Sequence, residues 1–223
     1  MQYTIQRTAD SPLDADWDAA PWNGAETLTV SHFHPARPAE HRPLVNAKVL
    51  YNETGLFIFF RVEDCFVRSV ATEYNDNVCW DSCVEFFVEP KPGLGYFNFE
   101  INAGGNILCS YALTADSAPD GQPKSTPLTN ALLDQVIIRP SLPPVVDPEI
   151  TEPTTWTIRY HLPLAVLEHH VGPLGDPAGQ TWRANFYKCA DHTSKPHWAS
   201  WAPLGDVLSF HLPEYFQPII FAS

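Results

Sequence analysis

The sequence predicts an all-β fold, an antiparallel β-sandwich of the jelly-roll type with about ten strands and one short helix. Short apolar runs alternate with turn-rich segments along the chain, and this spacing is typical of a sandwich. The 22 prolines, against 11 glycines, favour turns, loops and strand edges over helices. The pattern lacks the helical segments that would connect parallel strands. We expect residues 1–223 to form a single domain, because this length is normal for one sandwich.

The first elements are a compact N-terminal segment and a hairpin. In residues 14–22, Trp17 and Trp22 are expected to attach the segment to the body of the domain. In residues 44–51, apolar side chains recur at every second position, as on one side of a strand. Residues 56–62 (LFIFFRV) indicate a buried strand. Because the turn-forming sequence NETG separates these two runs, we expect them to pair as a hairpin.

The remaining elements follow the same pattern of apolar runs and turns. Further strands are expected at residues 82–89, 96–102, 107–112, 134–139, 155–161, 181–189 and 217–221. The short helix is expected at residues 163–170, because proline is tolerated in a first helical turn. Segments rich in Pro, Ser, Asp and Gly indicate irregular loops at residues 114–129 and 140–154.

The charge of the chain restricts its partners. A net charge of -13 disfavours nucleic acid, because such binding depends on neutralising phosphates with Lys and Arg. An anionic membrane surface is disfavoured for the same reason, and no stretch approaches the length of a membrane helix. Neutral ligands, cations and basic partners remain open. We expect a monomer.

The cysteines predict a reducing compartment. Five cysteines in a chain of this size give no even disulfide framework, so they are expected to pack as small apolar side chains. The N-terminus lacks the basic and apolar regions of a signal peptide, and both observations favour a cytoplasmic location. Cys79 and Cys83 are four residues apart, but no second such pair follows, so we assign no metal ligands and no cofactor.

Polar side chains interrupt strands that are otherwise apolar. Glu85 lies in the middle of the run CVEFFV, where an unpaired buried charge would be costly. Glu100 and Asn102 alternate with core residues in the next strand, and Tyr187 lies on a third. If these strands are neighbours, their carboxylates and amides form a hydrogen-bonding surface. Sugar hydroxyls, which both donate and accept, need such groups.

Aromatic side chains near these strands are candidate stacking surfaces for the apolar faces of a sugar. Trp80 lies beside the Glu85 strand, and Phe210 lies near the C-terminal strand. Trp198 and Trp201 are further candidates, whereas the strand residues Trp156 and Trp182 are expected in the core. The sequence therefore predicts a carbohydrate-binding protein with Trp80, Glu85, Glu100, Asn102, Tyr187 and Phe210 at the site.

Several of these strings resemble family 9 carbohydrate-binding modules, in particular a family 9-like branch. The resemblance covers nearly the whole chain and is clearest in CWDSCVEFF (79–87), YFNFEIN (96–102), ANFYKC (184–189) and FHLPEYF (210–216). It implies a β-sandwich in which two aromatic rings clamp a mono-, oligo- or polysaccharide. It also implies a non-catalytic module that serves xylanases and other glycoside hydrolases in polysaccharide degradation.

The resemblance also suggests roles for individual residues. Glu85 and Asn102 match a strand Glu and a sugar-binding Asn of the family. Glu100 falls where xylanase-linked members have Arg, and Phe210 falls where they have the second clamping Trp. Trp80 lies one residue from the first clamping Trp. Structural calcium is implied too, although the sequence shows no Asp-rich loop with calcium spacing.

Three other hypotheses remain. If their strands are neighbours, Glu85 and Glu100 would lie near the separation of the carboxyl pair in retaining glycosidases, which makes a glycoside hydrolase the first alternative. The late residues Cys189, His192, His197 and His211 are candidates for a zinc site. A sandwich that has lost sugar binding is the third hypothesis, and it would be favoured if Trp80 and Phe210 were buried away from Glu85.

Overall fold

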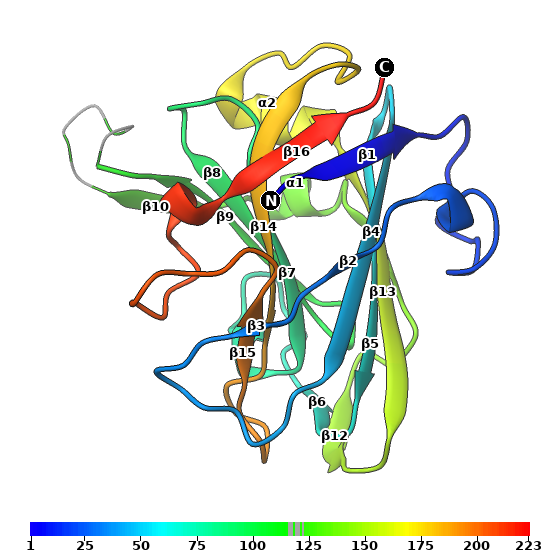
Figure 1. Ribbon diagram of the computed structural model, residues 1–223, viewed down its shortest axis with the longest axis vertical. Helices are drawn as coiled ribbons and strands as arrows, with labels where there is room; N and C mark the ends of the chain where they lie inside the picture. The colour runs from blue at the N-terminus through cyan, green and yellow to red at the C-terminus, as the bar shows by residue number, and fades with distance from the viewer. Residues whose placement is uncertain (116–117, 119–120, 122) are drawn as a thin grey trace.

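The fold is a two-layered β-sandwich, and this confirms the predicted fold class (Figure 1). The computed structural model describes residues 1–115, 118, 121 and 123–223. Over this part of the chain there are sixteen strands and two α-helices, with short 3₁₀ turns between them. The number of strands exceeds the predicted number because several are only two to five residues long.

The first layer has the strand order β10-β9-β8-β7-β14-β16. Its antiparallel centre is formed by β7 (Cys83–Glu89), β8 (Tyr96–Asn102) and β14 (Thr181–Cys189). The flanking strands are β9 (Ile107–Leu113), β10 (Lys124–Pro127) and β16 (Gln217–Phe221). Two short strands, β15 (Trp198–Ser200) and β3 (His32–Phe33), extend it beyond part of β14.

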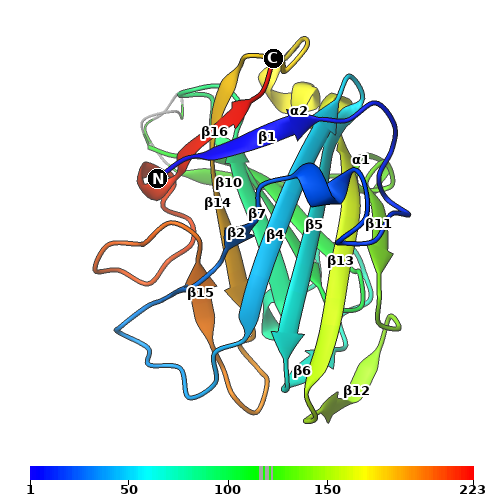
Figure 2. The ribbon, with the colours of Figure 1, turned by 45° about the vertical axis from the view of Figure 1, so that its right-hand side comes forward.

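The second layer has the order β4-β5-β13-β11 and lies opposite the first, as Figure 2 shows. Its strands are β4 (Leu44–Asn52), β5 (Gly55–Asp64), β13 (Thr154–Pro163) and β11 (Ile137–Pro140), with β2 (Leu28–Thr29) beside β4. The predicted hairpin is confirmed, because β4 and β5 pair antiparallel from Leu44↔Glu63 to Asn52↔Gly55.

One N-terminal strand joins the two layers. Strand β1 (Tyr3–Arg7) pairs in parallel with β16 through Tyr3↔Ile219 and with β4 through Gln6↔Leu50. In Figure 1, β1 and β16 lie side by side, so the first and last strands of the chain are neighbours, with the two termini at opposite ends of the pair. The sequence prediction did not include β1, because a five-residue strand with a polar half gives a weak pattern.

The core fills the space between the layers. Each strand contributes alternate side chains, so Val84, Phe86 and Val88 of β7 face inward. Trp156 and Trp182 are fully buried, as predicted. Trp22 is also fully buried, and with the partly buried Trp17 it packs on the outer face of β4 and β5, so the N-terminal segment is attached as expected.

The segments expected to be loops contain further short elements. Strand β12 (Val146–Ile150) lies in the proline-rich segment 140–154 and pairs with β6 (Val67–Ser69). Strand β10 and the one-turn helix α1 (Asn130–Leu133) follow the loop after β9. The part of that predicted loop at residues 116–117, 119–120 and 122 lies outside the described residues.

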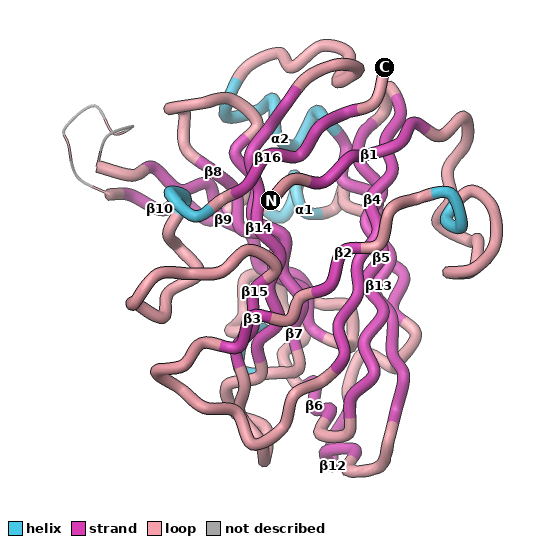
Figure 3. Tube along the Cα trace, in the orientation of Figure 1, coloured by secondary structure: helices cyan, strands magenta, loops and turns pink. Residues whose placement is uncertain are grey.

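The helix expected at residues 163–170 is observed as α2 (Leu164–Val171), which packs its apolar side chains against the core. Strand β11 starts at Ile137, three residues later than predicted, because α1 and a turn occupy the preceding positions. Among the described residues, no helix is long and apolar enough to cross a membrane. Figure 3 shows how strands and loops, rather than helices, dominate the chain.

Candidate functional site

A cavity of about 280 Å³ opens on the outer face of the first layer, over β7, β8 and β14. The loops that follow β14 and β15 contribute to its walls. Its lining combines carboxyl groups with aromatic rings: Glu85, Glu100, Asp191, Phe87, Trp198 and Phe210. This is the mixture of polar and apolar surface that ligand sites generally show.

Strand pairing brings the predicted acidic residues together. Glu85 on β7 is the direct cross-strand partner of Glu100 on β8 and of Tyr187 on β14. Because the inward positions of these strands are filled by core residues, these three side chains belong to the outer face. The strands are therefore neighbours, as the sequence prediction required.

Glu85 is buried in the floor of the cavity, and within the described part of the chain only one of its two carboxyl oxygens has a hydrogen-bond partner. Its Oε1 accepts the thiol hydrogen of Cys189 at 2.9 Å, and 2% of the residue is exposed. Among the described residues no group bonds to its Oε2. Burial and the neighbouring Glu100 raise the pKa of Glu85 well above its usual value. Burial thus favours the protonated form of Glu85, and one of its two carboxyl oxygens is left without a hydrogen-bond partner in the described structure.

Two more carboxyl groups share this environment. Glu100 accepts a hydrogen bond from Asn98 Nδ2 at 2.8 Å, and burial raises its pKa to about 7. Burial also raises the pKa of Asp191, which accepts a hydrogen bond from Trp198 Nε1 at 2.6 Å. With a pKa of about 7, Glu100 can therefore both donate and accept hydrogen bonds near neutral pH.

The aromatic wall is held from beneath by Tyr187. Phe210 stacks on Tyr187 with ring centroids 4.2 Å apart and planes 15° apart. The Tyr187 hydroxyl donates to the Phe210 carbonyl at 3.1 Å. Tyr187 is fully buried and does not line the cavity, so in this structure it positions Phe210. Trp198 also lines the cavity, and the guanidinium carbon of Arg37 lies over its ring, 4.6 Å from the ring centroid.

Trp80 lies in a neighbouring cavity. Its ring stacks on His192 with centroids 4.6 Å apart, and 46% of the residue is exposed. Arg68 and Asp81 line the same hollow, which shares no lining residue with the Glu85 cavity. The contact of Trp80 with a sugar stays a prediction, but it would lie apart from Glu85.

Asn102 lies on the expected face but anchors a turn. Its Nδ2 donates to Asp81 Oδ2 at 2.9 Å and to the Ala71 carbonyl at 3.0 Å, and its Oδ1 accepts from the Asn106 amide. The turn that it closes contains Gly105, whose φ of +89° favours glycine. With these bonds made, the predicted sugar contact of Asn102 stays a prediction.

The candidate zinc residues do not gather. His192 stacks on Trp80, His211 Nδ1 meets the Tyr96 hydroxyl at 3.0 Å, and His197 is bound to Lys188. Within the described part of the chain, the one group of three potential ligands is Cys83, Glu85 and Cys189. Two thiols do not fit calcium, which requires oxygen ligands, so this group is not the implied calcium site.

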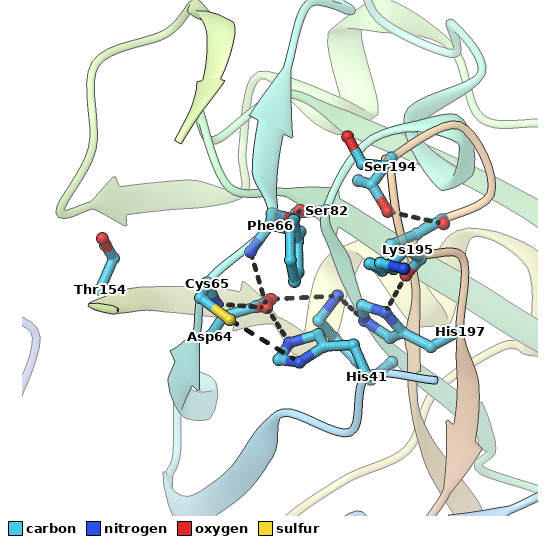
Figure 4. A network of polar contacts seen from close by, with 12 residues as sticks. His41, Asp64, Cys65, Phe66, Ser82, Thr154, Ser194, Lys195 and His197 are labelled. Atoms are coloured by element: carbon cyan, nitrogen blue, oxygen red, sulfur yellow. Dashed lines mark hydrogen bonds and ion pairs between the residues drawn. The ribbon is translucent and has the colours of Figure 1, made fainter. Parts of the chain in front are cut away.

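A second polar cluster lies on the core side of β14 (Figure 4). Lys188 Nζ donates to His197 Nε2 at 2.8 Å and lies 3.8 Å from Asp64 Oδ2, and the other oxygen of Asp64 is 2.7 Å from His41 Nε2. His197 Nδ1 faces the Lys195 carbonyl, which can only accept, so this nitrogen carries the proton. Burial and the Lys188 charge lower the pKa of His197 to about 3, so the ring is neutral.

Some residues of the cavity were not predicted. Asp191 lies two residues after the end of β14, and a carboxylate near a strand end was the available signal. Arg37 lies in a loop far away in sequence and gave no signal. The bond between Cys189 and Glu85 depends on which strands are neighbours, and this is decided only in three dimensions.

The fold and this cavity together define a β-sandwich binding module. The sequence matches the model of carbohydrate-binding family 9 over residues 28–221, and the chain belongs to this family. No curated protein matches the chain in sequence.

Solved structures show the same fold. A Bacteroides uniformis protein, provisionally described as carbohydrate-binding, superimposes with a TM-score of 0.86 at 24% identity, over 99% of this chain and 98% of that one. A family 9 module from Caldicellulosiruptor kristjanssonii in complex with cellotriose gives 0.65 at 12% identity, over 100% and 94% of the two chains. Its glucose complex gives 0.64 at 11% identity, over 99% and 95%.

Proposed function

We propose that this protein binds a saccharide in the cavity over β7, β8 and β14. Membership of carbohydrate-binding family 9 supports the class of ligand. The observation that carries the proposal is the free Oε2 of Glu85, a buried oxygen without a protein partner in the described structure. A buried polar atom of this kind is costly unless a ligand or water satisfies it.

The carboxyl groups suit hydroxyl ligands. The raised pKa values of Glu85 and Glu100 favour their protonated forms, which can donate as well as accept. A sugar hydroxyl also does both. Adjacent hydroxyls of one sugar ring would meet Glu85 and Glu100, which are direct neighbours across the two strands.

The aromatic wall suits the apolar face of a sugar ring. Phe210 is fixed by its stack on Tyr187, and Trp198 presents a second ring to the cavity. Covering about 100 Å² of apolar surface would contribute about 2–3 kcal/mol. Trp80 and Asn102 are not needed for this pose, and Trp80 would meet only a more extended ligand.

Glucose and cellotriose, the ligands of the related complexes, are the first candidates for isothermal titration calorimetry, followed by a glycan array. We expect Glu85→Ala to weaken saccharide binding about tenfold, a loss of about 1.4 kcal/mol, because hydroxyl contacts are removed. Phe210→Ala should weaken it through lost stacking.

Glu89→Ala is the matched control. Glu89 lies on the same strand and outer face as Glu85 but lines another hollow. Its variant should bind the saccharide like the wild type. Unchanged affinity in both Glu85→Ala and Phe210→Ala would remove this cavity as the binding site.

One observation favours a second function, glycoside hydrolysis. Glu85 and Glu100 are direct cross-strand partners, whose Cβ atoms are typically about 4.5–5.5 Å apart, in a cavity with raised pKa values. Retaining glycosidases use carboxyl groups at about 5–5.5 Å. Release of nitrophenol from aryl glycosides by the wild type, abolished in Glu100→Gln, would support hydrolysis. Saccharide binding without turnover would exclude it for those substrates.

A further inference from the structure

Two thiols and a carboxyl group converge in the floor of the cavity. Cys83 on β7 and Cys189 on β14 are direct cross-strand partners, and Glu85 lies two residues along β7 on the same face. One ligand atom from each of the three residues lies within 4.8 Å of the others. None of the three is more than 2% exposed. The sheet itself therefore holds these groups together.

The cluster is open on one side. Glu85 and Cys189 line the cavity, whereas Cys83 is not part of its lining. The Oε2 atom of Glu85 is buried without a partner among the described residues. Glu100 and Asp191 line the same cavity and supply two more carboxyl groups around it. An unpartnered oxygen beside two thiols, in an acidic surrounding, points to a cation rather than to an apolar guest.

We propose that Cys83 Sγ, Cys189 Sγ and the Glu85 carboxylate bind one zinc ion, with its fourth position open to the cavity. Zinc accepts sulfur and carboxylate ligands in a tetrahedron, at about 2.3 Å from sulfur and about 2.0–2.2 Å from oxygen. Ligand atoms of such a tetrahedron lie about 3.5–4 Å apart, so atoms within 4.8 Å of one another need only small movements. Thiolates select zinc over magnesium and calcium.

The protons balance without any redox step. Each Zn–S bond forms as a thiol releases its proton to solvent, and the carboxyl group releases its proton as it ligates the ion. Burial raises the pKa of Cys83 to about 12 and raises that of Cys189, so the metal-free thiols are protonated. Zinc affinity should therefore increase with pH.

This site does not rest on the proposed saccharide function, although the two share Glu85. The open fourth position would be filled by water or by an oxygen of a ligand in the cavity. Saccharide titration of metal-free protein tests the proposed function by itself, and zinc titration without saccharide tests the metal site by itself. If the zinc titration shows no binding, the proposed saccharide function is unaffected, and the reverse also holds.

The experiment uses protein stripped of metal with a chelator and kept reduced. Zinc is titrated against a chromophoric competitor, and cobalt(II) replaces zinc for spectroscopy. We expect one metal ion per chain and a thiolate-to-cobalt charge-transfer band. Cys83→Ser and Cys189→Ser should each weaken zinc binding at least tenfold and remove that band. Cys65→Ser is the matched control, because this free cysteine lies outside the cluster, and it should bind zinc like the wild type.

A measurement on the wild type decides the question if the serine variants do not fold. Zinc titrations in buffers of different ionisation enthalpy give the number of protons released. Two thiols require two or more protons per zinc near neutral pH, whereas surface histidines, mostly neutral there, release few. Absence of zinc binding, release of less than one proton, or wild-type affinity in folded Cys83→Ser and Cys189→Ser would overturn the site.

Discussion

Glu100 illustrates how one residue's surroundings determine its protonation. In sequence it is an ordinary outward position in an alternating strand. In the fold, β7 and the loops over the cavity bury it, and only 6% of it remains exposed. Burial disfavours the charged form, and Asp191 adds to the effect.

This burial predicts a pH dependence of stability. The folded pKa of Glu100, about 7, lies above its usual 4.5, so the folded state binds the proton more tightly. Its contribution is fully present below about pH 4.5 and is lost as the pH rises through 7. In metal-free protein, Glu100→Gln should gain stability relative to the wild type by up to about 3 kcal/mol between these pH values. Urea unfolding at a series of pH values measures it.

Glu53→Gln, at an exposed position, is the control for this series. Its unfolding free energy should follow the wild-type curve. A constant difference between Glu100→Gln and the wild type across this pH range would show that folding does not raise the pKa of Glu100.

At the scale of the element, the two faces of β14 have different roles. Tyr187 and Cys189 belong to the cavity side, whereas Ala184 and Phe186 fill the core. Lys188 lies on the inward side too, near the end of the strand, where its Nζ donates to His197 and lies 3.8 Å from Asp64 Oδ2. Strict alternation therefore brings an ammonium group into the sandwich, and the surrounding loops supply its partners.

Lys188→Met is predicted to destabilise the protein by about 3 kcal/mol or more, because it leaves the buried Asp64 without its cation. Thermal and urea unfolding would show the loss. Lys195→Met removes a half-exposed lysine that pairs with the exposed Glu40, and it should change stability by less than about 1 kcal/mol. Equal effects of the two substitutions would contradict a structural role for the buried cluster.

At the scale of the whole molecule, β1 closes the sandwich by pairing with a strand of each layer. Ile5 of β1 is fully buried in the common core. Its neighbour Gln6 is exposed. A short N-terminal strand thus contributes both sheet hydrogen bonds and core packing between segments that are about two hundred residues apart in sequence.

Ile5→Ala should therefore lower the free energy of unfolding by about 2–5 kcal/mol, although it lies near the chain end. Gln6→Ala, one residue away on the same strand, should change it by less than about 0.5 kcal/mol. Urea unfolding of both variants provides the measurement. A small effect of Ile5→Ala would mean that β1 is only loosely attached.

The pairing of the strands could be predicted only in part. The β4–β5 hairpin and the long strands β7, β8, β13 and β14 follow from local alternation and turns, and these were found. Strands β1, β3, β6 and β15 are short, and the partners of β1, β3 and β6 lie far away in sequence. Local pattern carries little information about such strands, because tertiary contacts determine whether they form.

The sequence by itself determined the sandwich class, the long strands, and a carboxyl group at Glu85 in an apolar strand, because side-chain alternation is a local property. The tertiary structure alone decided which residues meet there. It placed Cys83 and Cys189 opposite one another beside Glu85, placed Trp80 in another hollow, and engaged Asn102 in a turn. These outcomes depend on strand order and loop packing, which are set by the burial of the whole core.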